Sequence, residues 1–266
     1  MFPELTREEL AAGLDRVVAE ILEKTSVQKP PVDVMAVART LGIAVALDDR
    51  QDGRARFVRL GDRWSGCSRA TILLRPEPRF ERRHWAVAHE IGEHVAHRVF
   101  AQWGADPVET AANAREQVAN WLAGRLLLPT AWFEADAAAC GWDLLALKAR
   151  YNTASHELIA RRMLECRPAV VISIFDQRRI SFRRSNVSGR VPPPLPAEVE
   201  CWNTIRDHRR PSKTCHGPSL VQGWPIHEQG WDREILRMEV EQWGAEEDID
   251  ATALHGNRWK PMVSAE

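Results

Sequence analysis

Polar side chains that can bind a metal ion or transfer a proton are concentrated in one segment, Trp85–His97, which reads WAVAHEIGEHVAH. Successive residues of a helix point about 100° apart, so positions three or four apart share a stripe. The polar stripe of this segment consists of His89, Glu90, Glu93 and His97. Beside it runs an apolar stripe that would face the core, made of Ala88, Ile91, Val95 and Val99. Because burying such polar groups without partners is costly and a bound cation offsets that cost, the segment predicts a metal centre.

A second segment, Glu116–Pro129, reads EQVANWLAGRLLLP and also has helical spacing. One face of this helix would carry Glu116, Ala119, Asn120 and Ala123. Alanine side chains are small, so this face allows a partner helix to approach closely. The segment therefore predicts a helix that packs against the first one and presents a glutamate to it.

The two helices, expected over 80–100 and about 108–128, would form an antiparallel pair joined by a short turn. With a rise of about 1.5 Å per residue, His89 and Glu116 both lie roughly 12–17 Å from that turn. Glu116 can therefore lie level with His89. A helix that carries His and Glu, followed by a helix that supplies another Glu, is the ligand arrangement of a zincin-type peptidase.

The remaining sequence predicts both helices and short strands. A capping box at Thr6 starts a first helix, and Asp33 caps a second, shorter one. Further helices are predicted over 144–151, 155–166 and 198–208, and strands over 43–47, 56–60, 70–74, 169–175 and 180–184. Residues 234–240 fit either a helix or a strand. The mixture predicts an α+β fold.

The chain resembles the ImmA/IrrE family of metallopeptidases. The resemblance rests on HEIG at His89 and EQVAN at Glu116, with KPPVD at Lys29 before them and ASHELIARR at Ala154 after them. It covers about residues 28–166. The HE pair alone is a weak signal, but together with the spaced E-x-x-A-N block it is specific.

This resemblance implies a mostly helical zincin-like metallopeptidase domain with a small sheet over 1–166. A smaller C-terminal α/β module over 167–266 is indicated by a hairpin, a proline-rich connector and a Trp-rich segment. The implied function is that of a metal-dependent endopeptidase acting on a specific protein, a helix-turn-helix transcriptional repressor. A non-catalytic scaffold that binds such a repressor is the alternative.

Family members read H-E-x-x-H, whereas this chain has Glu93 in place of the second histidine. One interpretation assigns the metal to His89, Glu93 and Glu116, with Zn²⁺ as the ion and Mn²⁺ or Fe²⁺ more competitive because two ligands are carboxylates. The other takes His94 as the ligand, which requires a π-bulge that Gly92 would permit. Under both interpretations Glu90 is the general base.

Composition limits the classes of protein to which the chain can belong. Lys and Arg number 36 and Asp and Glu 37, so the net charge of −1 argues against direct nucleic-acid binding. No apolar run approaches the roughly 20 residues of a membrane span, so no membrane partner is expected. The 5 cysteines show no CxxC spacing, which favours a reducing cytoplasm.

Several other groups of residues are expected to be structural. Cysteines and histidines at 201, 208, 215 and 216 match no metal-site spacing. The segment 148–162 looks like a helix-turn-helix, but in the family it belongs to the peptidase fold. His84 and His97 are expected in the core or at the surface and not as ligands. The basic clusters 79–83 and 178–184 are expected to be solvated or to contact a protein.

Overall fold

The computed structural model describes residues 6–240, except positions 51, 62–67, 107, 109, 217 and 218. The chain divides after Arg162 into two compact units, and each is described separately below. The division lies slightly before the boundary expected at 166, because the short 3₁₀ helix η1 (Met163–Glu165) groups with the second unit.

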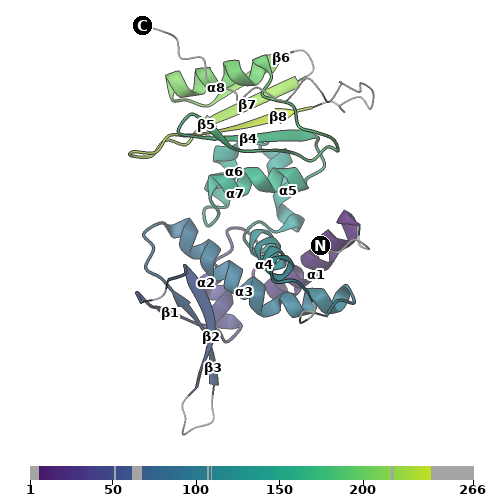
Figure 1. Ribbon diagram of the computed structural model, residues 1–266, viewed down its shortest axis with the longest axis vertical. Coiled ribbons are helices and arrows are strands. Elements are labelled where there is room, and N and C mark those ends of the chain that lie inside the picture. Colours follow the sequence, from purple (N-terminus) through teal and green to yellow (C-terminus); the bar gives the residue numbers. More distant parts are fainter. Residues whose placement is uncertain are drawn as a thin grey trace. The chain divides into compact units, whose positions relative to one another are not determined.

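The first unit is mostly helical (Figure 1). Its helices are α1 (Arg7–Lys24), α2 (Val34–Thr40), α3 (Phe80–Gln102), α4 (Ala112–Leu127), α5 (Thr130–Ala139), α6 (Leu144–Arg150) and α7 (His156–Arg162). The capping box at Thr6 is present, and the Asp33 carboxylate accepts hydrogen bonds from the first turn of α2. Within the described residues, no helix combines the length and apolar character needed to cross a membrane.

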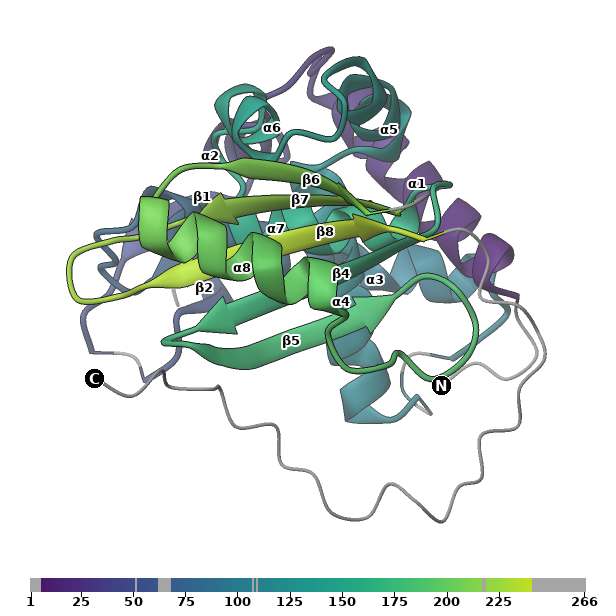
Figure 2. The same cartoon turned by 90° about the horizontal axis from the view of Figure 1, so that it is seen from above.

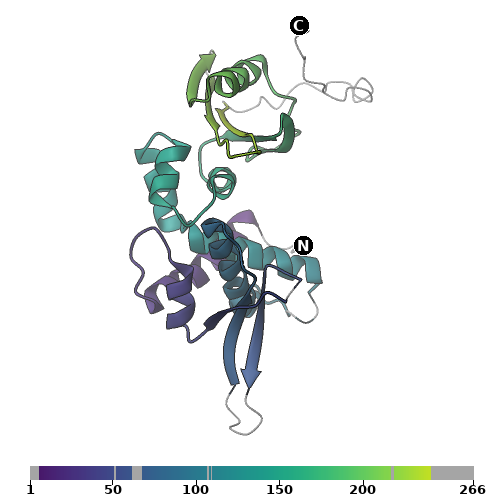
Figure 3. The same cartoon turned by 90° about the vertical axis from the view of Figure 1, so that its left-hand side faces the viewer.

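A small sheet packs beside α3. It consists of β1 (Ala44–Leu47), β2 (Ala55–Gly61) and β3 (Ser68–Leu74) in the order β1-β3-β2. The central strand β3 is parallel to β1 and antiparallel to β2, and its Ile72 is fully buried. Figure 3 shows β2 and β3 side by side beneath the helices. Both β1 and β2 are therefore edge strands, and β2 contacts α3.

The closest helix pair of the unit is α3 with α4. On α3 the apolar stripe is buried, including Ile91 and Val99. Gly92 lies directly on the α4 backbone: a Cβ at this position would be 2.7 Å from the Ala119 carbonyl oxygen and 3.3 Å from Leu122 Cβ. Gly92 therefore permits close helix contact. The helix α3 is regular throughout, so Gly92 does not form the π-bulge considered from the sequence.

The second unit is an antiparallel sheet with one helix across it (Figure 2). Its strands are β4 (Val170–Asp176), β5 (Arg179–Ser185), β6 (Ser212–His216), β7 (Ser219–Pro225) and β8 (Arg233–Glu239), and its helix is α8 (Pro196–His208). The sheet order is β5-β4-β8-β7-β6. Cys201, Trp202 and Ile205 of α8 pack on Val171, Phe175 and Leu236 of the sheet.

A buried ion pair attaches α8 to the sheet. Glu198 is almost fully buried and accepts hydrogen bonds from the Arg183 guanidinium at 2.7 and 2.9 Å, as well as one from Leu195 N–H. The cluster 178–184 was expected to be solvated or to contact a protein, whereas its Arg183 pairs with Glu198 inside the unit. The Arg183 guanidinium has an acidic partner within the unit because β5 lies at the edge of the sheet next to β4, where Glu198 near the start of α8 reaches Arg183.

The α+β class agrees with the sequence-based prediction, but several elements differ. Residues 233–239 form a strand, which resolves the open alternative for that segment. The strands β6 and β7 and the helix α5 were not predicted, and α4 begins later than residue 108. Five consecutive residues of β8 are buried, so the strand lacks the alternation of polar and apolar residues that identifies a strand in sequence.

Gly92→Ala is expected to destabilise the protein by about 1–3 kcal/mol, because the new methyl group overlaps the α4 backbone. Chemical denaturation monitored by circular dichroism measures this. The control is Gly124→Ala in α4, where the nearest atom to a new Cβ is Leu158 Cδ1 at 3.8 Å. This control should be neutral or stabilising by up to ~1 kcal/mol. Equal effects of both variants would contradict the close contact at Gly92.

Candidate metal centre

The central turns of α3 bring three potential metal ligands together. One ligand atom each of His89, Glu90 and Glu93 lies within 4.8 Å of the others. His89 Nε2 is 3.8 Å from Glu93 Oε1, one helical turn away. Glu93 is exposed and His89 is partly exposed, so the group can be reached from solvent at Glu93.

The neighbouring helix α4 adds Glu116 and Asn120. Glu116 Oε2 lies 3.6 Å from His89 Nε2. The Asn120 side chain donates to Glu116 Oε1 at 3.2 Å, and its carbonyl oxygen lies 3.2 Å from His89 Nδ1. An Nδ1–H group that donates to the Asn120 carbonyl oxygen would leave His89 Nε2, which faces both carboxylates, for a metal ion.

Two distances from His89 Nε2 have the size expected between ligands of one small divalent ion. Ligand atoms bound about 2.1 Å from a tetrahedral ion lie about 3.4 Å from one another. The two distances from His89 Nε2, 3.8 Å to Glu93 and 3.6 Å to Glu116, are close to that value. The donor set of one imidazole and two carboxylates also suits Zn²⁺, Mn²⁺ or Fe²⁺.

Glu90 differs from the other carboxylates in its burial. It is 6% exposed, and burial together with the negative charges of Glu93 and Glu116 raises its pKa. The backbone N–H of Phe57 in β2 donates to the Glu90 carboxylate and acts in the opposite direction. This contact was not predicted, because it joins two segments whose pairing depends on how the sheet packs on α3. A carboxylate with a raised pKa is suited to accept a proton.

The other histidines of α3 point elsewhere. The His94 ring stacks on Phe57 with the ring centroids 4.7 Å apart. His97 is exposed and Nδ1 donates to the backbone carbonyl of His94 at 3.0 Å. His84 is buried near Phe80, at a different part of the helix. On this regular helix, Glu93 and not His94 lies beside His89.

The remaining sequence candidates do not assemble a second centre among the described residues. Cys201 is buried in the core of the second unit, and burial raises its pKa to about 11. Cys215 is exposed on β6, His208 ends α8, and the side chain of His216 lies outside the described residues. These positions are spread over separate elements of the unit.

The basic residues of segment 148–162 are occupied inside the first unit. Lys148 donates to Glu81 at 2.6 Å and to the carbonyl oxygens of Asn152 and Ala154. Arg162 is buried and donates to the Leu128 carbonyl. Lys148 and Arg162 are therefore held by partners within the unit, whereas Arg150 and Arg161 are exposed and pair with Asp136 and Glu157.

Comparisons with known proteins place this arrangement in context. Residues 38–164 match the model of the family Peptidase_M78, described as the IrrE N-terminal-like domain. No curated protein matches the sequence. Among solved structures, a Mycobacterium tuberculosis transcriptional regulator is similar, with a TM-score of 0.62 and 17% identity over 85% of this chain and 75% of that chain. At this identity the likeness shows a shared fold.

Asn120→Ala is expected to weaken divalent-metal binding about 10–100-fold, because Asn120 holds both His89 and Glu116 in position. Titration with Zn²⁺ against a chromophoric chelator measures the affinity. Asn113→Ala, at an exposed position of the same helix, is the control and should leave the affinity unchanged. Wild-type affinity in Asn120→Ala would exclude this positioning role.

Proposed function

We propose, from the match of residues 38–164 to the Peptidase_M78 family model and from the geometry of the site, that the chain is a metal-dependent endopeptidase. One observation carries the proposal: carboxylates from two different helices lie 3.8 and 3.6 Å from His89 Nε2, beside the buried carboxylate of Glu90. Hydrolysis of a peptide bond needs an electrophilic centre and a base in such proximity.

His89, Glu93 and Glu116 would hold the metal ion. When bound, a divalent ion supplies Lewis-acid chemistry, polarising the attacking water and the carbonyl of the peptide bond. Asn120 fixes the imidazole orientation through Nδ1. Two carboxylate ligands neutralise the charge of a divalent ion, so harder ions than Zn²⁺ are also favoured.

Glu90 would transfer the proton. Its carboxylate takes a proton from water as the water oxygen bonds to the carbonyl carbon, and passes it to the amine nitrogen as the C–N bond breaks. The raised pKa of Glu90 brings the carboxylate closer to the pKa that such a transfer requires. The Phe57 N–H keeps the carboxylate oriented before substrate arrives.

The edge strand β2 is the proposed binding surface for the substrate backbone. It lies at the edge of its sheet, and its Phe57 touches both Glu90 and His94. A substrate segment that adds to this edge as an extended strand would pass directly over the metal centre. An extended segment of a protein fits this geometry better than a folded domain does.

The proposed substrate is a helix-turn-helix transcriptional repressor. The family resemblance supports this, and the similar M. tuberculosis protein is titled a transcriptional regulator. Among the described residues, Cys140, Cys166, Cys201 and Cys215 form no disulfide, as expected for the proposed cytoplasmic location. Direct contact with nucleic acid is not part of the proposal.

A second candidate is a repressor-binding scaffold without peptidase activity. Glu93 stands where the family has histidine, and this favours the scaffold. A metal ion whose charge is reduced by a second carboxylate ligand lowers the pKa of its bound water less than an ion held by two histidines and one glutamate. The two candidates differ in metal dependence. A scaffold would bind a repressor equally well with and without a chelator and would leave it intact.

Glu90→Gln is expected to abolish cleavage while metal binding and folding are retained, because an amide cannot accept the proton from water. The assay combines the purified protein with a repressor encoded beside its gene and follows the products by mass spectrometry. Glu157→Gln, at a half-buried position on α7 that pairs with Arg161 away from the metal centre, is the control and should cleave normally. Near wild-type cleavage by Glu90→Gln would remove Glu90 as the base.

Glu93→Ala and Glu116→Ala are expected to lose metal, whereas His94→Ala should keep it, because His94 faces Phe57. Elemental analysis of the purified variants measures bound metal. His94→Ala should lose only some stability with its ring stacking, about 0.5–1.5 kcal/mol. Loss of metal from His94→Ala and full occupancy in Glu93→Ala would reverse the ligand assignment.

A further inference from the structure

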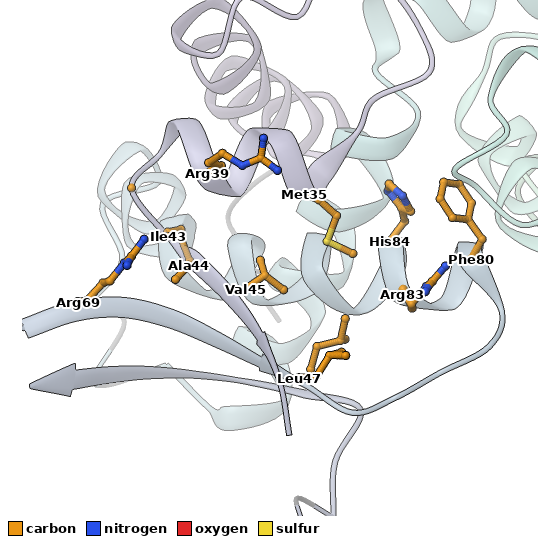
Figure 4. Close-up of a pocket in the computed structure, with 12 residues that line it drawn as sticks. Met35, Arg39, Ile43, Ala44, Val45, Leu47, Arg69, Phe80, Arg83 and His84 are labelled. Atoms are coloured by element: carbon orange, nitrogen blue, oxygen red, sulfur yellow. The ribbon is translucent and has the colours of Figure 1, made fainter. Parts of the chain in front are cut away.

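A cavity separate from the metal centre lies between α2, β1, β3 and the first turns of α3 (Figure 4). Its volume is about 640 Å³, within the range of about 300–1,000 Å³ typical of small-molecule sites. Most of its wall is apolar: Met35, Ile43, Ala44, Val45, Leu47, Leu74 and Phe80. Of the described residues that line it, none belongs to the group around His89.

Large apolar side chains at this cavity remain exposed. Leu47 at the end of β1 is 71% exposed, and Phe80 at the start of α3 is 45% exposed. Leu47 belongs to an edge strand of only four residues, and Phe80 opens its helix. Since both side chains line the same cavity, a ligand with an apolar body would cover them there.

The polar part of the wall carries positive charge. Arg39 of α2, Arg69 of β3 and Arg83 of α3 line the cavity, and none of its described lining residues is acidic. In the described part of the chain, no carboxylate forms an ion pair with any of these three guanidinium groups. Arg83 instead lies over the Phe80 ring, 5.8 Å from the centroid. The three arginines come from separate elements, so the tertiary fold collects their charge.

A buried histidine completes the wall. His84 is 3% exposed, and its Nδ1 has no hydrogen-bond partner among the described residues. A buried polar atom without a partner costs about 1–3 kcal/mol, which a ligand group can recover. Burial lowers the pKa of His84, although the charges of Asp33 and Glu81 act in the opposite direction. The ring is therefore neutral at pH 7 and can donate or accept.

We propose that this cavity binds a small amphipathic anion, a molecule with a carboxylate or phosphate group on an apolar body. The apolar body would contact Met35, Leu47 and Phe80, and the anionic group would be attracted by the arginines that stand around the cavity. Three guanidinium groups without acidic partners favour an anion over a neutral or cationic ligand. The inference is independent of whether the protein is a peptidase, because no residue of the metal centre takes part.

Isothermal titration calorimetry of the full chain with octanoate tests the proposal. Octyl phosphate is the second anion, and octanol and octylammonium are the neutral and cationic analogues. Saturable binding of one anion per chain is expected, with octanol and octylammonium at least tenfold weaker. Amide NMR shifts on binding should map to residues 35–47 and 80–84. Tighter binding of octanoate than of octyl phosphate would identify a carboxylate site. Tighter binding of octyl phosphate would identify a phosphate site.

Arg39→Gln, Arg69→Gln and Arg83→Gln are each expected to weaken octanoate binding because each removes a positive charge from the wall, and the arginine that meets the carboxylate should show a loss of about tenfold, the size of a lost charge-assisted hydrogen bond. Arg82→Gln is the matched control: it is adjacent on α3, pairs with Glu77 and lies outside the cavity wall, so binding should be unchanged. Thermal melting confirms that each variant is folded. Equal binding of octanol and octanoate, no saturable binding, or equal loss in Arg82→Gln and Arg83→Gln would overturn the proposal.

Discussion

The close contact between α3 and α4 at Gly92 is the constraint on which the candidate metal centre depends. Because residue 92 has no side chain, the α4 backbone at Ala119 lies directly against α3. Glu116 lies one turn before Ala119 on α4, so the same contact brings its carboxylate to 3.6 Å from His89 Nε2. A wider helix spacing would leave His89 and Glu93 without their partner from the second helix.

The negative charge that this contact concentrates has an electrostatic consequence. Glu90, Glu93 and Glu116 lie near one imidazole, and their mutual repulsion contributes to the raised pKa of Glu90. Neutral Asn120 bridges His89 and Glu116 and adds no charge. A divalent cation would relieve the repulsion. Protein groups that repel one another until a cation binds are characteristic of a binding site and unusual in a purely structural cluster.

The helix α3 contributes to two chemically opposite environments. His84 and His89 are five residues apart, which places them about 140° apart around the helix axis. On one side, carboxylates gather with α4. On the other, arginines from α2, β3 and α3 itself surround an apolar cavity. The two environments are separated by the buried stripe of the helix, so each can bind a ligand of opposite charge without direct contact with the other.

The sequence by itself determined the local structure and the chemistry of the candidate centre. Helical spacing identified His89, Glu90 and Glu93 as neighbours, the length of the turn placed Glu116 level with them, and caps at Thr6 and Asp33 located helix starts. These features depend on near neighbours or on one antiparallel pairing.

The tertiary structure decided the rest. It gave Gly92 a packing role, stacked His94 on Phe57, brought the Phe57 N–H to Glu90, and collected three arginines around a cavity. It also formed β6, β7 and β8. The strand β6 is short, and β7 and β8 have runs of consecutive buried residues, so none of them shows the alternation of polar and apolar residues that predicts a strand from sequence. Such contacts join residues far apart in the chain, and their geometry follows from the packing of whole elements, which no local pattern encodes.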